Sequence, residues 1–190
     1  MGMERLRNEA AAIDFVRRNT CIPVPTVRCA FEDHGRFYLI TDMVLGIEMA
    51  KLSPDQKAVV MEELSGYLEI MRTMTSKKMG GFLGDACLPY RLAMALPHDA
   101  GSVLKFNHTT EYEYVLCHND LSQHNIIVDE ETLKINAIID WEYAGYYPKE
   151  FEGAYYKRPG PSGALKGEVD DVSHLLGILH RCTEGGLAES

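Results

Sequence analysis

The sequence lacks long apolar runs, and its positive charge is scarce. No apolar stretch approaches the ~20 residues of a membrane-spanning helix, and the opening MGMERLRNEAAA is charged where a secretory signal would be apolar. We therefore predict a cytoplasmic protein that does not enter the membrane. Lys and Arg number 19 against 28 Asp and Glu, which gives a formal net charge of -9. Because nucleic-acid binding depends on clustered basic side chains, this balance argues against a nucleic-acid partner.

Paired cysteines, repeats and low-complexity segments are absent as well. The cysteines number 5, are scattered, and include no CxxC pair, which argues against a zinc site and a disulfide framework. We interpret them as small buried hydrophobic residues in a reducing compartment. What remains is a chain of 190 residues, 46% hydrophobic, which is long enough for one globular domain or two small lobes. The cysteines are Cys21, Cys29, Cys87, Cys117 and Cys182.

The N-terminal part predicts a helix followed by a β-hairpin. Residues 5–18 carry apolar side chains at helical spacing, and the prolines of CIPVP end that helix. Two β-rich runs, 26–31 and 36–44, are separated by EDHG and predict an antiparallel pair. Gly46 then breaks the second run.

A second helix has a clear start signal. Ser53 suits the N-cap, Pro54 the first helical position, and Gln56 the third, so that a capping box is predicted. Apolar residues follow at helical spacing, which predicts that the helix lies against a core. These residues are Val60, Leu64, Tyr67, Leu68, Met71 and Met74.

The C-terminal part predicts a second hairpin and a closing helix. Residues 126–128 and 133–140 are apolar runs separated by a polar turn, DEET. Residues 168–181 have apolar positions at helical spacing. Residues 79–110 are weakly patterned and carry no structural prediction.

The segment CHNDLSQHNI, residues 117–126, gathers polar groups between apolar stretches. His118, Asp120 and Asn125 fit HxDxxxxN, and the following hairpin ends in Asp140, fifteen residues after Asn125. Phosphoryl transfer from ATP needs a carboxylate that orients and deprotonates the attacking hydroxyl, and oxygen ligands for Mg²⁺. Asp120 suits the first role, and Asn125 with Asp140 suits the second. A turn-forming aspartate is the alternative for Asp120, but the joint match favours the catalytic interpretation.

With these motifs the sequence resembles the aminoglycoside phosphotransferase and choline kinase-like family, distant relatives of the protein kinases. The resemblance rests on CHNDLSQHNI and IIDWEYAG and extends to NEAAAIDFVRRNTCIPVPTV and YLITDMVLG. It implies that Asp120 is the catalytic base, with His118 supporting the loop, and that Asn125 and Asp140 bind Mg²⁺.

The resemblance also implies a site for ATP. Glu9 matches the glutamate that pairs with an ATP-binding lysine, and main-chain groups at Asp42 and Val44 would meet adenine. The family's nucleotide loop and lysine strand need more residues than the eight that precede Glu9, and no lysine lies among those eight. We therefore expect the strands that cover the ATP phosphates to be missing from the first lobe.

The resemblance implies an α+β, protein-kinase-like fold of two lobes. The boundaries we predict are a truncated N-lobe over 1–45 and a mainly helical C-lobe over 46–190. The implied activity is ATP- and Mg²⁺-dependent phosphorylation of a hydroxyl on a small-molecule acceptor that the sequence does not identify. Loss of the strands beside the first hairpin also predicts self-association or a partner at its exposed edge.

Two alternative functions stay open. Because the lysine is not found, the chain could be a catalytically inactive family member that binds nucleotide or a protein partner. Alternatively, His118, Asp120 and His124 could be metal ligands of a hydrolase, with Asp140 as a fourth ligand. Imidazole ligands would then favour zinc or another transition metal over Mg²⁺.

Overall fold

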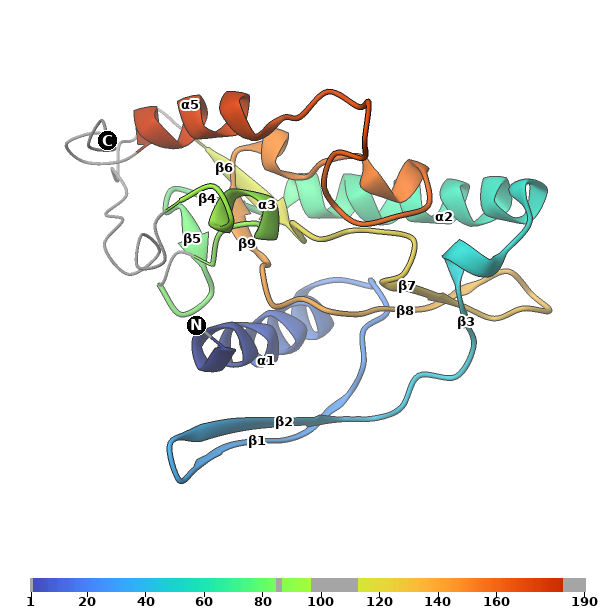
Figure 1. Ribbon diagram of the computed structural model, residues 1–190. Helices are drawn as coiled ribbons and strands as arrows, with labels where there is room; N and C mark the ends of the chain where they lie inside the picture. Colours follow the sequence, from blue (N-terminus) through green and yellow to red (C-terminus); the bar gives the residue numbers. More distant parts are fainter. Residues whose placement is uncertain (1, 85–86, 97–112, 183–190) are drawn as a thin grey trace.

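Helices and small antiparallel sheets alternate along the chain (Figure 1). The computed structural model describes residues 2–84, 87–96 and 113–182. The α-helices are α1 (Gly2–Asn19), α2 (Pro54–Thr73), α3 (Tyr90–Ala93) and α5 (Val172–Cys182), and the short 3-10 helices are η1 (Met49–Lys51), η2 (Lys149–Phe151) and η3 (Tyr155–Lys157). The strands are β1 (Val27–Asp33), β2 (Arg36–Thr41), β3 (Ile47–Glu48), β4 (Thr75–Ser76), β5 (Gly80–Gly81), β6 (Tyr114–Cys117), β7 (Ile126–Val128), β8 (Ile135–Ile138) and β9 (Gly145–Tyr147).

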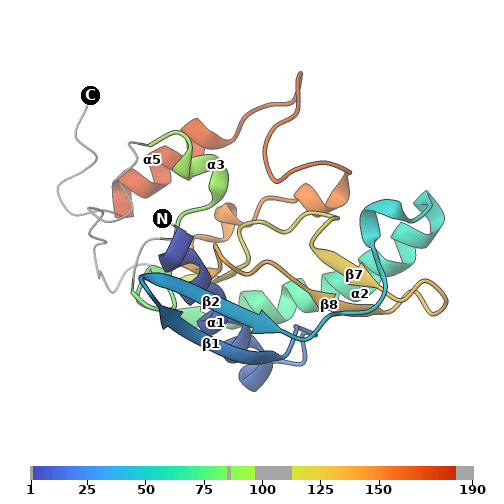
Figure 2. The same cartoon turned by 60° about the horizontal axis from the view of Figure 1, so that its bottom comes forward.

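The predicted first helix and hairpin are confirmed. β1 and β2 pair antiparallel, and α1 packs against them on one side (Figure 2). The turn between the strands consists of His34 and Gly35, with φ of 48° and 71°. Two successive positive φ values suit the tight hairpin turns whose twist matches that of the strands. The local sequence therefore determines both the position and the geometry of this hairpin.

The predicted capping box at the start of α2 is also confirmed. The Ser53 hydroxyl accepts a hydrogen bond from the Gln56 main chain at 3.4 Å, and the Gln56 side chain accepts one from the Ser53 main chain at 3.0 Å. These two bonds satisfy N–H groups that no helical carbonyl can reach. The core-facing side of α2 carries Val60, Leu64, Leu68 and Met71.

The second half contains the predicted β7–β8 hairpin and the predicted helix α5, together with strands that the sequence did not predict. β3 adds to the hairpin to give the order β3-β7-β8, and a second sheet has the order β4-β6-β9-β5. The mainly helical C-lobe thus also contains two small sheets. Of the segment 79–110, which carried no prediction, residues 85–86 and 97–110 lie outside the described residues.

The hydrophobic core continues across the predicted lobe boundary at residue 45. Residues of α1 are buried in the same cluster as residues of α2, β7 and β8. The boundary itself stays a prediction, but α1 is bound firmly to the second half of the chain. Members of this cluster are Ala12, Ile13, Val16, Leu64, Ile126, Ile138 and Trp141.

Two expectations about the surface can be compared with the structure. Cys87, Cys117 and Cys182 are buried as expected, but Cys21 and Cys29 are exposed, so the prediction that all cysteines are buried was wrong. Cys29 lies in β1, where every residue from Arg28 to Asp33 is exposed. Within residues 2–84, 87–96 and 113–182, no helix combines the length and the apolar character that a membrane crossing requires.

We expect Ser53→Ala to destabilise the protein by about 1 kcal/mol, because it removes the N-cap acceptor of α2. Urea unfolding measures this change. Ser65→Ala, on the exposed face of the same helix, is the control and should change stability by less than about 0.5 kcal/mol. Equal effects of the two substitutions would contradict the role of the cap.

Self-association at the exposed edge of the hairpin stays a prediction, and apolar side chains on the outer face of the same hairpin would be buried with that edge. Phe31 and Tyr38 stack with ring centroids 5.2 Å apart, and Ile40 beside them is 51% exposed. We expect Ile40→Lys to reduce the concentration-dependent mass measured by light scattering, because a charge there opposes burial of this face. Val59→Lys, at an α2 residue 53% exposed, is the control. A monomeric unsubstituted chain at all concentrations would contradict the prediction.

Candidate active site

The β7–β8 hairpin brings the predicted base and both predicted metal ligands together. The Asn125 side-chain amide donates a hydrogen bond to the main-chain carbonyl of Asp120 at 2.8 Å. The main-chain N–H of Ile139 donates to the main-chain carbonyl of Asn125 at 2.9 Å. Asp140 follows directly, and its carboxylate is close enough to Asp120 for the two charges to repel. The structure therefore juxtaposes the three residues, while their roles stay predictions.

His118 lies beneath this loop, where it joins the loop to the end of β8. Its ring is fully buried at 4.6 Å from the Trp141 ring. Nε2 lies 3.0 Å from the Ile139 carbonyl oxygen, and Nδ1 accepts a hydrogen bond from the Asp120 main chain at 3.3 Å. Only a neutral ring protonated at Nε2 satisfies both contacts. Burial lowers the pKa of His118 to about 4, in agreement with a neutral ring.

We expect the His118 ring to stay neutral and protonated at Nε2 at pH 6. Since an unfolded histidine titrates near ~6.5, its folded pKa of about 4 contributes stability that is present above pH ~6.5 and is lost as the pH falls toward 4. Two-dimensional ¹H–¹⁵N spectra of the imidazole nitrogens identify charge and tautomer, and His118→Gln identifies the signal by its disappearance. An imidazolium signal for His118 at pH 6 would contradict this assignment.

Three carboxylates, those of Glu9, Asp140 and Glu142, gather beside α1. Burial raises the pKa of Asp140 to about 6, and the charges of Glu142 and Asp120 raise it further, while Arg5 opposes them. Burial, followed by the charges of Asp140 and Glu142, raises the pKa of Glu9 to about 7. Glu9 therefore faces Asp140, the predicted metal ligand.

Arg5 supplies positive charge to this group of carboxylates. Its Nη1 donates to Glu142 Oε1 and to the Tyr143 hydroxyl, each at 2.6 Å. Its charge also favours ionised Asp140. Arg5 and Glu142 are 137 residues apart in the sequence, so no local pattern indicates their contact.

Asn8 is a positioning residue that the sequence analysis missed. Its side chain is buried, and its Nδ2 donates to the carbonyl oxygens of Glu142 at 3.1 Å and Ala144 at 2.8 Å. Its Oδ1 accepts from the Phe82 main chain at 2.8 Å. Asn8 thereby fixes α1, and with it Glu9, against the chain that follows Asp140. A polar residue beside the predicted apolar stripe is a signal that could have identified it.

A cleft of about 370 Å³ contains all the residues that were predicted to meet the nucleotide. Glu9, Asp42, Val44 and Asp140 line it, together with apolar side chains such as Ile13. Three segments that are distant in the sequence, at Glu9, at Asp42 with Val44, and at Asp140, thus meet at one cleft.

Asp42 is engaged within the protein through both its main chain and its side chain. Its N–H donates to the Thr26 carbonyl at 2.9 Å, and its carboxylate forms a paired contact with Arg28 at 2.6 and 2.7 Å. The contacts of adenine with the main chain at Asp42 and Val44 stay predictions.

The donor set fits Mg²⁺. The side-chain nitrogen of Asn125 donates to Asp120, so the side-chain oxygen Oδ1 is the atom that could bind the metal. Asp140 would add a carboxylate. Mg²⁺ in nucleotide sites takes one or two such oxygens and completes its shell with water and phosphate.

The side chains of His118 and His124 do not form the metal site that the alternative hydrolase function would require. His118 uses both ring nitrogens within the protein, and the exposed His124 contacts Glu48 of β3 at 2.7 Å. In the described part of the chain, no three His, Cys, Asp or Glu side chains converge as such a metal site would need.

Two site residues have left-handed backbone conformations. The φ angles of Asn119 and Asp140 are 69° and 65°. Asn and Asp tolerate this region better than most residues, and strained conformations persist where the surroundings fix them. Asn119 directly precedes Asp120 in the loop before β7, and Asp140 follows the end of β8.

Comparison with known proteins identifies the family of this chain. The chain matches the profile of the phosphotransferase enzyme family over residues 2–181. It is 44% identical over 54 residues to probable choline kinase 3 of Arabidopsis thaliana, a match that spans 28% of this chain and only 15% of that protein.

A solved structure has a similar fold. It is a thermostable mutant of aminoglycoside phosphotransferase APH(4)-Ia in a ternary complex with ADP and hygromycin B. The TM-score is 0.56 at 16% identity, over 95% of this chain and 68% of that one. At this identity the similarity establishes the kinase-like fold alone.

Proposed function

Because the chain belongs to the phosphotransferase enzyme family, we propose that it transfers the terminal phosphoryl group of ATP to a hydroxyl of a small molecule. One observation carries the proposal: Asp120, Asn125 and Asp140 are joined by a single hairpin, and Asp140 also lines a cleft with Glu9 and Val44. The residues proposed to activate the hydroxyl and to bind Mg²⁺ are thus connected to this cleft through Asp140.

Asp120 is the residue proposed to act on the acceptor. Its carboxylate would accept a hydrogen bond from the acceptor hydroxyl, orient it, and take its proton as the oxygen attacks phosphorus. His118, through its contact with the Asp120 main chain, holds this group in place. Mg²⁺, held by Asn125 and Asp140, would neutralise charge on the phosphates when it is bound.

A nucleotide-binding member without turnover is the second candidate. The charges that act on Glu9 in this chain are those of the carboxylates Asp140 and Glu142. Arg5 provides positive charge nearby, but it is engaged with Glu142 and Tyr143. We therefore expect weak binding of Mg·ATP and slow transfer or none.

We expect Mg·ATP at ~100 times its dissociation constant to stabilise the chain by ~2.7 kcal/mol. Thermal unfolding with and without nucleotide measures this shift. Asp140→Ala should abolish it, because Asp140 is a proposed metal ligand, whereas Asp120→Asn should keep it and lower any phosphoryl transfer at least about a hundredfold.

Glu131→Gln is the control for these substitutions. It removes one negative charge at an exposed residue in the turn between β7 and β8. It should change neither the shift nor the transfer. A shift without turnover would favour the second candidate, full activity of Asp120→Asn would disprove the assigned base, and no shift at millimolar nucleotide would contradict both candidates.

A further inference from the structure

A short linker, residues 44–46, connects the cleft to the sheet that carries the proposed metal ligands. Val44 lines the cleft, Leu45 and Gly46 follow it, and the chain then continues as β3. In the β3-β7-β8 sheet, β7 lies between β3 and β8. Asn125 directly precedes β7, and Asp140 follows β8. The path of the linker therefore relates the cleft wall at Val44 to the hairpin with both ligands.

Gly46 is the point at which the linker crosses β7. A Cβ atom added at this residue would lie 2.4 Å from the main-chain carbonyl oxygen of Val128 and 3.2 Å from Ile127 Cγ2. The φ angle of Gly46 is 125°, a conformation that glycine adopts far more readily than other residues. The main chain of the linker thus lies directly against the main chain of β7, with no room for a side chain between them.

Asn136 of β8 holds the residue that precedes this crossing. Its Nδ2 donates a hydrogen bond to the main-chain carbonyl oxygen of Leu45 at 2.9 Å. Asn136 is the exposed residue of β8, whereas the other residues of that strand are buried. Its side chain is therefore available at the surface of the sheet, where the linker passes.

The far end of the crossing is fixed by different contacts. β3 pairs antiparallel with β7 over both of its residues. Glu48 Oε2, in β3, also lies 2.7 Å from His124 Nδ1 in the loop before β7. These contacts hold the linker beyond Gly46, so Asn136 acts on the part between Gly46 and the cleft.

We propose that Asn136 is a positioning residue that fixes the Leu45 carbonyl and thereby orients the main chain at Val44 for adenine. The inference rests on the proposed function for its effect on adenine, but not for its effect on the linker. The Leu45 side chain is 70% exposed, so it provides little packing to hold this peptide group. Without the Asn136 donor, the carbonyl would turn to water and the linker would gain conformational freedom on the side of the cleft.

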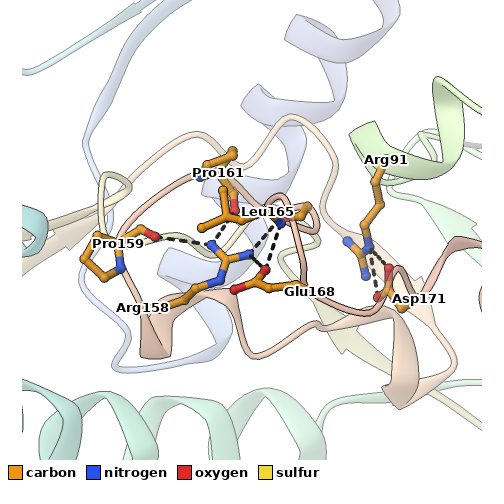
Figure 3. Close-up of polar contacts among 8 residues, drawn as sticks. Arg91, Arg158, Pro159, Pro161, Leu165, Glu168 and Asp171 are labelled. Carbon is orange, nitrogen blue, oxygen red and sulfur yellow. Dashed lines mark hydrogen bonds and ion pairs between the residues drawn. The ribbon is translucent and has the colours of Figure 1, made fainter.

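A contact of the same kind in loop 158–168 provides a matched control. Glu168 Oε2 accepts hydrogen bonds from the Leu165 main-chain N–H at 2.8 Å and from Arg158 Nη2 at 2.6 Å (Figure 3). Arg91 beside this loop pairs with Asp171 instead, at 3.1 Å. The cleft is lined by other residues. Glu168→Ala therefore removes an exposed loop contact without touching the proposed nucleotide site.

The direct test is ¹H–¹⁵N NMR of the main chain, which needs no nucleotide. The Gly46 nitrogen is bonded to the Leu45 carbonyl carbon, so its chemical shift reports the hydrogen bond that this carbonyl accepts. Asn136→Ala, and Asn136→Leu with a side chain of similar size, should both move the Gly46 signal to lower ¹⁵N shift. Glu168→Ala should leave it in place. A Gly46 signal unchanged in both Asn136 variants would overturn the proposal.

The binding test separates the orientation of adenine from general stability. Mg·ATP and inorganic Mg·triphosphate both carry phosphates, but only ATP carries adenine. Asn136→Ala and Asn136→Leu should raise the Kd for Mg·ATP about fivefold, as expected for the loss of one hydrogen bond. Both should leave the Kd for Mg·triphosphate unchanged, and Glu168→Ala should change neither constant. Isothermal titration measures all of them.

The outcomes distinguish this inference from the proposed function. An equal loss of affinity for both ligands, or an unchanged Kd for Mg·ATP, would overturn the effect of Asn136 on adenine. If the unsubstituted chain binds neither ligand, the proposed function fails and the effect on adenine fails with it. The Gly46 signal then still decides whether Asn136 fixes the linker.

Discussion

Antiparallel pairing of β7 with β8 is the constraint on which the site depends. The hairpin starts immediately after Asn125 and ends just before Asp140, so its register sets the distance between the two proposed metal ligands. The Ile139 N–H bond to the Asn125 carbonyl closes the open end of the hairpin. A shift of one residue would turn every side chain of β8 to the opposite face and remove Asp140 from the cleft. The buried side chains of both strands oppose such a shift.

The loop before β7 has no regular structure of its own, so other parts of the chain must hold it. The His118 ring contacts the Ile139 carbonyl just after β8, and the Asn125 side chain donates to the Asp120 carbonyl within the loop. The Glu152 carboxylate, in the segment after β9, accepts a hydrogen bond from the His118 main-chain N–H. These contacts approach the loop from different directions. A short irregular segment therefore has a defined backbone path without the regular ladder of bonds that stabilises a strand.

Sequence patterns predicted the helices and strands that are marked by neighbouring residues, such as apolar spacing, capping residues and turn residues. α1 and α2 are long enough for apolar spacing and caps to identify them, and the β1–β2 turn has its own signal in HisGly. β3, β4, β5 and β9 have only two or three residues each, too few for any periodicity. Their existence depends on pairing with distant strands, which no local pattern records.

The same distinction explains the site. Asp120, Asn125 and Asp140 were found because they fall within one short stretch, where spacing carries information. Glu152 contacts the loop across 34 residues, and Asn8 reaches Ala144 across 136. Neither contact has a sequence signature. The motifs therefore identify the groups proposed to act chemically, whereas the residues that hold those groups emerge only from the folded chain.

The ionisable groups of the site destabilise the fold from opposite ends of the pH range. Neutral His118, with a pKa of about 4, contributes stability that is lost as the pH falls below its unfolded value of ~6.5. Glu9 and Glu152, each with a pKa of about 7, have folded values above their unfolded ones, so their contribution is lost as the pH rises through 7.

Near neutral pH the chain must therefore accommodate growing negative charge around Asp140. Arg5 and Arg91 offset it on two sides, at Glu142 and at Glu152 respectively. A cation bound by Asp140 would favour the ionised carboxylates of Glu9 and Glu142 directly, because both interact with Asp140. Positive charge in the cleft would therefore offset the repulsion among these carboxylates, which agrees with the proposal of a metal–nucleotide site.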